Sequence, residues 1–179
     1  MVYSPAYPAS LFGKPLLNQA IAIIQRDQPA AIAYVNSILL PIMEYHKGPM
    51  MRTAMPWLTL GINGPRFGID QYPYVRSEDL MMGLQLDVGQ FDQEFAQDNA
   101  QDYARVLDII LTTAPSADWI TPLPIQHETV PTGITSPGQL GTVKYVFPES
   151  HSYSIVFVQE IPAPIIRVTI NVLFHLEEQ

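Results

Sequence analysis

Histidines with acidic neighbours are the residues of this chain whose types and spacing most suggest chemistry. Glu44 precedes His46 by two residues, and Glu149 precedes His151 by two residues. In a strand this spacing places both side chains on one face, where they could share a metal ion. No two histidines are four residues apart and no H-E-x-x-H motif occurs, so we predict no metal site. We expect His175, near the C-terminus, to lie at a rim or an interface.

Other stretches resemble known functional motifs but lack the order of residues that those motifs require. "DVGQFDQEF" lacks the residue order of a calcium-binding loop, and "GINGPRFG" matches neither a dinucleotide fingerprint nor a P-loop. No G-x-S-x-G elbow is present. The chain has no cysteine, which excludes disulfides, thiolate zinc sites and a cysteine nucleophile. We therefore predict no catalytic residue, cofactor site or metal site. An enzyme that uses His46 with Glu44 stays as a minor alternative.

The composition narrows the class of partner. Only 15% of the 179 residues are charged, against about 25% in ordinary domains. Either the surface is rich in amides and hydroxyls, or neighbouring subunits cover much of it. The net charge is −8, and the nine basic residues form no cluster, which argues against tight nucleic-acid binding. Without an apolar run of about 20 residues or a signal peptide, we expect no membrane contact and assembly inside the cell.

The first half of the chain shows helical and then strand patterns. Residues 1–13 have the composition of an extended arm. A helix is expected from Lys14 with an interruption at "RDQP", then a second helix from Pro29 to about residue 42, and then a loop at "HKGP". Strands are expected at 57–62 and 79–88. Residues 63–79 are rich in glycine and proline and read as a long loop between them.

The second half predicts one helix, a loop excursion and two strands. Apolar residues recur at helical spacing over 91–113. Residues 114–150 read as loops with a short strand near 119–123, a further short strand near 125–130 and brief pairing of "KYVF". Strands are expected at 153–161 and 167–176. In the last strand apolar and polar side chains alternate, so one face is buried. The prediction is a single α+β domain over 14–179, with a mainly antiparallel sheet, helices on one face and long loops.

This order of elements resembles the tail-terminator and related tail-completion or neck proteins of tailed bacteriophages. The stretches that carry the resemblance are "WLTLGI", "LMMGLQLDV", "FAQDNAQDYARVLDIILT", "YSIVFVQEI" and "IRVTINVLFHLEE". The chain departs from the family in its length, in the excursion at 114–150 and in the divided N-terminal helix.

The resemblance implies a structural virion protein without catalytic residues or cofactor. It implies a ring, usually of six subunits, that caps the tail tube and joins it to the head connector. Such a protein is assembled in the host cytoplasm and located in the virion, and DNA passes it without specific binding. An acidic surface suits that passage. The resemblance also makes the terminal strand part of the rim of the subunit.

In this interpretation residues 63–79 form an arm that reaches a neighbour or the tube. Its predicted interface residues are Arg66, Phe67, Tyr72, Tyr74 and Arg76. Aromatic residues beside arginine are typical of protein interfaces. The main alternative is a small α+β module that binds a ligand or a protein, with a pocket lined by Tyr72, Tyr74 and Trp57.

Overall fold

A computed structural model describes seven stretches of the chain and arranges them as one sheet with two helices. The described residues are 13–47, 55–69, 76–89, 93–114, 120–122, 140–157 and 164–178. The helices are α1 (Gly13–Val35) and α2 (Gln93–Thr113). The strands are β1 (Glu44–Lys47), β2 (Trp57–Ile69), β3 (Arg76–Gly89), β4 (Ile120–Pro122), β5 (Leu140–Val156) and β6 (Ile165–Glu178). This is the α+β class that the sequence predicts.

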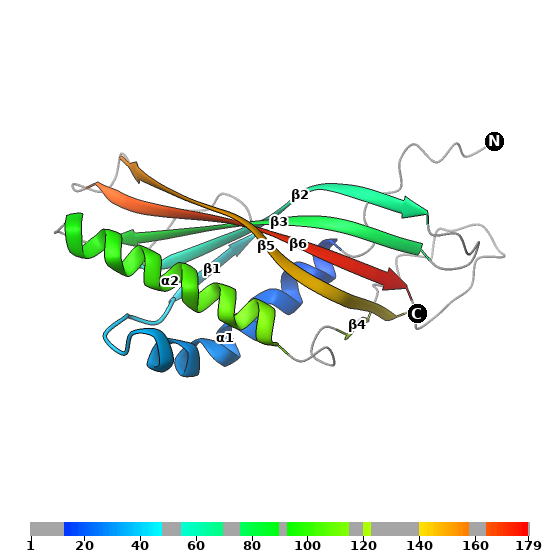
Figure 1. The fold of residues 1–179 in the computed structure, drawn as a ribbon, viewed down its shortest axis with the longest axis horizontal. Helices are drawn as coiled ribbons and strands as arrows, with labels where there is room; N and C mark the ends of the chain where they lie inside the picture. Colours follow the sequence, from blue (N-terminus) through cyan, green and yellow to red (C-terminus); the bar gives the residue numbers. More distant parts are fainter. Residues whose placement is uncertain are drawn as a thin grey trace.

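The sheet has the strand order β1-β2-β3-β6-β5-β4, and only the β1–β2 pair is parallel. α2 connects β3 to the second half of the chain. The last strand of that half, β6, lies between β3 and β5 (Figure 1). The expectation that this strand forms part of the rim is therefore wrong. It is a central strand, and its alternating pattern is that of a strand buried on its helix-facing side.

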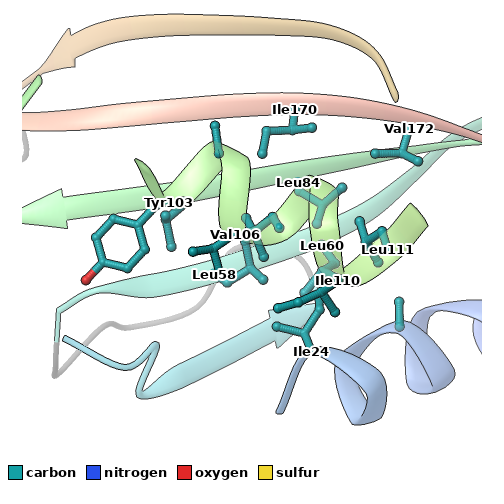
Figure 2. Close-up of a cluster of buried hydrophobic side chains, with 14 of the residues drawn as sticks. Ile24, Leu58, Leu60, Leu84, Tyr103, Val106, Ile110, Leu111, Ile170 and Val172 are labelled. Atoms are coloured by element: carbon teal, nitrogen blue, oxygen red, sulfur yellow. The ribbon is translucent and has the colours of Figure 1, made fainter. Parts of the chain in front are cut away.

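The hydrophobic core lies between the sheet and the two helices. Leu80, Met82, Leu84, Leu86 and Val88 of β3 are buried, as the sequence predicts, and so are alternate residues of β6 from Val168 to Leu176. Figure 2 shows side chains of both helices meeting those of β2, β3 and β6. Within the described residues, no helix is long and apolar enough to cross a membrane.

The N-terminal helix is continuous, although the sequence predicts a break. α1 passes through Pro29, so the first part of the second predicted helix, residues 29–35, is helical but continues the first helix, and the chain leaves helical geometry after Val35. A proline inside a helix removes one hydrogen bond and costs about 3 kcal/mol. Burial of apolar side chains on both sides of Pro29, including Ile24 and Ile32, offsets this cost. Part of the predicted loop after this helix is β1, which pairs with the start of β2.

The segment 63–79, which the sequence predicts as a long loop forming a hairpin or an arm, is largely an antiparallel hairpin. β2 extends to Ile69 and pairs with β3 as far as Arg76, while 70–75 lie outside the described residues. The register shifts between Asn63 and Pro65. β1 pairs only with residues 57–60, so Pro65 stands on an edge and beside a bulge, which are the places where a sheet tolerates proline.

The predicted excursion at 114–150 also contains regular structure. β4 falls inside the short strand predicted near 119–123, but residues 140–150 and the strand predicted from Tyr153 are one strand, β5. β5 passes Pro148, where its register against β6 shifts. The same physical reason applies, because this proline also lies at a bulge of a strand near the edge of the sheet. Residues 123–139 lie outside the described part.

Candidate protein–protein interface

The long strand β5 has a free edge over most of its length. β4 pairs only with its first three residues, 140–142. Within the described part of the chain, residues 143–156 therefore have a strand neighbour on one side only, which is β6. A free edge presents unpaired N–H and C=O groups, and such edges are the usual place where another chain adds to a sheet.

Large apolar side chains are exposed along this edge. We call this set the β5 patch, and it consists of Tyr145, Phe147, Tyr153, Ile155 and Phe157. The patch extends over both faces of the strand, because Phe147 lies opposite Leu173 and Ile155 lies opposite Ile166 of the core. Natural edge strands are usually protected by charge. The β5 edge carries Lys144 and Glu149, but five large apolar side chains remain exposed beside them, which indicates a surface that a protein partner covers.

A second apolar surface lies where α1 leads into β1. We call it the α1–β1 patch, and it consists of Tyr34, Ile38, Leu40 and Met43. Tyr34 is 79% exposed, the highest value in this set. Residues 34–43, "YVNSILLPIM", contain no charged side chain. Interface cores are depleted in charge in the same way.

Two buried polar contacts fix the segment that carries the α1–β1 patch. The Gln28 side chain accepts a hydrogen bond from the Ile42 amide (2.8 Å) and donates one to the Ile42 carbonyl (3.3 Å). Asn36 donates to the Asp102 carboxylate of α2 at 2.8 Å. Hydrogen bonds therefore hold the segment at Asn36 and at Ile42, and it presents Ile38 and Leu40 from a fixed position between them.

Tyr103 makes a third contact with this segment, and its burial is expected to make the stability of the chain depend on pH. The Tyr103 hydroxyl donates to the Leu40 carbonyl at 2.6 Å, and burial raises the pKa of Tyr103 to about 12. Burial raises the pKa of Tyr45 to about 12 as well. A phenol whose pKa is higher in the folded state contributes stability that is fully present below about pH 10, its unfolded value, and lost as the pH rises towards 12.

We therefore expect the free energy of unfolding to fall between about pH 10 and pH 12. The Tyr103→Phe variant should be less stable at neutral pH and should lose part of this alkaline dependence, while Tyr45 retains the rest. Urea unfolding at a series of pH values measures both effects. An unchanged slope in Tyr103→Phe would show that this phenol is not shielded from water in the folded chain.

A shallow hollow of about 300 Å³ adjoins the α1–β1 patch between the two helices. Tyr34 belongs to both. The hollow is lined by Asp27, Ala30, Ala31, Tyr34, Ile109, Ile110 and Thr113. The hollow is open, whereas small-molecule sites usually enclose most of the ligand, so it suits one side chain of a protein partner better than a small molecule.

A buried polar cluster lies on the sheet face opposite the helices. Asp87 is 1% exposed, and its carboxylate accepts two hydrogen bonds from the Arg167 guanidinium (2.7 and 2.8 Å) and one from the Trp57 indole (2.8 Å). These hydrogen bonds raise the pKa of Arg167. Trp57 is 2% exposed, so it does not line an open pocket as the alternative interpretation of the sequence requires.

The two histidines that have an acidic neighbour in the sequence each lie beside one carboxylate, and the two pairs are separate. His46 lies 3.1 Å from Glu44, and His151 lies 3.0 Å from Asp108 of α2 rather than beside Glu149. The described residues contain no group of three or more histidine or acidic side chains that could hold a metal ion.

His175, predicted at a rim or an interface, contacts the two strands beside it, and one of these contacts is with the β5 patch. Its Nδ1 is 2.7 Å from Asp79 of β3, and its ring stacks on Tyr145 of β5 with centroids 4.8 Å apart. The strand pairing aligns all three residues on one face of the sheet. The histidine therefore supports one member of the β5 patch.

The predicted interface residues are only partly within the described structure. Arg66 and Phe67 belong to β2, where they pair with Asp79 and Glu78, and Arg76 is the first residue of β3. Tyr72 and Tyr74 lie outside the described residues. The hairpin still projects beyond the part of the sheet that β1 covers, so its role in contacts between subunits stays a prediction.

Sequence reasoning missed both apolar patches. The signal for the β5 patch is "YSIVFV", in which apolar residues occupy both faces of a strand. Such a strand is either central in a sheet or part of an interface. The signal for the α1–β1 patch is the run of ten uncharged residues at 34–43.

Comparison with known proteins shows the fold of this chain. No protein-family model matches the sequence, and no curated protein matches it. A chain from the structure described as the virion of a native gene transfer agent (GTA) particle has the same fold, with a TM-score of 0.52. The match covers 92% of this chain and 96% of that chain, at 10% sequence identity. The α+β arrangement therefore occurs over nearly the whole length of a chain of similar size.

Proposed function

We propose that this chain is a structural protein of a phage-like virion and forms a ring at the head–tail junction, as a tail terminator or neck protein. The exposed apolar edge of β5 is the observation that carries the proposal, because it requires a protein partner. The shared fold with a chain of the gene transfer agent virion supports it, since the match extends over almost the entire chain.

In this role the chain needs no catalytic centre or cofactor. Its partners are other copies of itself, the tail-tube protein and the head-connector protein, and the ring has six subunits. The net charge of −8 suits a channel for DNA, because an acidic wall repels phosphates and lets the duplex pass. The ring would be assembled in the host cytoplasm and would remain in the virion.

The mass of the purified chain in solution, with negative-stain images of the same sample, tests this proposal. We expect closed rings of about six subunits, since heterologous contacts close into rings when the rotation between subunits permits it. A compact monomer or an isolated dimer at high concentration would contradict self-assembly into a ring. It would favour the alternative, a small α+β binding module.

A further inference from the structure

We propose that copies of this chain bind one another head to tail, with the β5 patch of one copy on the α1–β1 patch of the next copy. The inference rests on the self-assembly in the proposed function and adds the two surfaces that meet. The occupant of each patch is thus a second copy of this chain.

The positions of the two patches favour a head-to-tail contact. The α1–β1 patch lies on the segment that leads into β1, at one edge of the sheet, whereas β5 lies next to the opposite edge (Figure 1). A symmetric dimer through either patch would leave the other patch exposed on both subunits. A contact between two different patches covers both on every subunit of a closed ring.

The two surfaces are both apolar, and the residues 34–43 that carry one of them have no charge that would oppose the contact. The β5 patch offers protruding aromatic side chains, among them Phe157, which is 82% exposed. The α1–β1 patch offers uncharged apolar residues beside the 300 Å³ hollow that Tyr34 lines. Aromatic side chains that enter a pocket on the partner are the usual source of binding energy in an interface.

The exposed areas are sufficient for a specific contact. An aromatic side chain can bury about 150–250 Å². Tyr145 and Phe147 lie on the other face of the sheet, so the part of the β5 patch that one neighbour can cover is Tyr153, Ile155 and Phe157. These three side chains offer roughly 350 Å², the α1–β1 patch offers roughly 500 Å², and together they expose roughly 850 Å² of apolar surface. Specific interfaces bury about 1,200–2,000 Å² in total, including a polar rim. The two patches therefore supply the apolar core of an interface of ordinary size.

Two variants that each disable one patch test this inference. Ile155→Glu with Phe157→Glu disables the β5 patch, and Tyr34→Glu with Ile38→Glu disables the α1–β1 patch. All four side chains are exposed, so we expect both variants to fold. Each variant alone should be a monomer, with association weakened by roughly 30-fold or more, as for the loss of hot-spot side chains.

The decisive sample is an equimolar mixture of the two variants. One variant retains an intact β5 patch and the other an intact α1–β1 patch, so the mixture should form 1:1 dimers that grow no further. Mass photometry and analytical ultracentrifugation distinguish such dimers from rings. The matched control is Gln25→Glu with Gln101→Glu, which adds the same charge at exposed polar positions of the two helices and should assemble as the wild type does.

Several outcomes would overturn the inference. Dimers formed by one variant alone would show a symmetric contact, and a mixture that remains monomeric would show that the patches do not meet. Circular dichroism and urea unfolding verify that the variants fold, and serine at the same four positions replaces glutamate if they do not.

The inference and the proposed function can fail separately. Wild-type rings that persist in both variants would contradict the inference and leave the ring intact. Open chains of wild-type subunits that both variants abolish would support the head-to-tail contact and contradict a closed ring. A wild type that is monomeric at about 1 mM, where even weak complexes are half formed, would contradict both.

Discussion

Replacing Asp87 with alanine is expected to lower the free energy of unfolding by about 3–5 kcal/mol, the usual effect of removing one partner from a buried ion pair. The Asp87 carboxylate is buried and accepts hydrogen bonds from Arg167 and Trp57. Without it, the Arg167 guanidinium loses two hydrogen bonds and the buried Trp57 indole loses the one it donates to this carboxylate. Denaturant unfolding of the wild type and the variant measures the difference.

The matched control removes an acidic side chain of the same type from the surface. Asp27 also lies 2.6 Å from an arginine, its neighbour Arg26, but that pair is solvent-exposed. Such pairs contribute about 0–1 kcal/mol, so Asp27→Ala should change the stability little. Equal losses in Asp87→Ala and Asp27→Ala would show that the cluster around Asp87 is open to water.

Replacing Phe174 with alanine is expected to cost about 3–5 kcal/mol, because the side chain is fully buried in the middle of the sheet. Phe174 belongs to the central strand β6, between β3 and β5, so a cavity there removes contacts with two strands and the helix layer. Thermal or denaturant unfolding measures the loss. Because Phe174 belongs to neither apolar patch, we expect the folded variant still to self-associate.

Leu173 is the matched control for this cavity. It is the preceding residue on the same strand, but it points to the opposite face and is only partly buried. Leu173→Ala should therefore destabilise the chain clearly less than Phe174→Ala does. The reverse order would mean that the helices cover the other face of β6.

The sequence predicts correctly the strands and the helix in which one face is buried and the other faces solvent. The strands from Leu80 to Val88 and from Val168 to Leu176 show a regular period of two, and the structure buries the predicted side chains. The helix over 91–113 shows a clear period as well, and α2 occupies residues 93–113 of it. In these elements the pattern of burial and the local preference of the residues agree.

The errors concentrate at prolines, where local preference and tertiary packing conflict. Pro29 indicates a helix boundary, but apolar residues on both sides hold α1 together. Pro65 and Pro148 indicate loops, but each lies at a register shift of a long strand near an edge. Proline has no backbone N–H group. The sequence alone does not reveal whether the fold needs a hydrogen bond from that position.

The candidate interface was harder to predict than the fold. The aromatic and arginine residues at 66–76 have the composition of an interface, so the sequence predicts the interface on this hairpin. The β5 patch has the composition of a core, and only the strand order shows that residues 143–156 have a free edge within the described part of the chain. The strand order is therefore needed to recognise an interface of this kind.

Intermolecular crosslinking in solution tests most directly the claim that copies join the β5 edge to the α1–β1 surface in a closed ring. The chain has no cysteine, so thiols can be introduced singly. Ser37→Cys lies in the α1–β1 segment and Ser154→Cys lies on β5, both at exposed positions. With a flexible bis-maleimide, the double variant should give a ladder that ends at one covalent ring, and each single variant should stay monomeric. Equal crosslinking of a single variant, or a double variant that remains monomeric, would contradict the account.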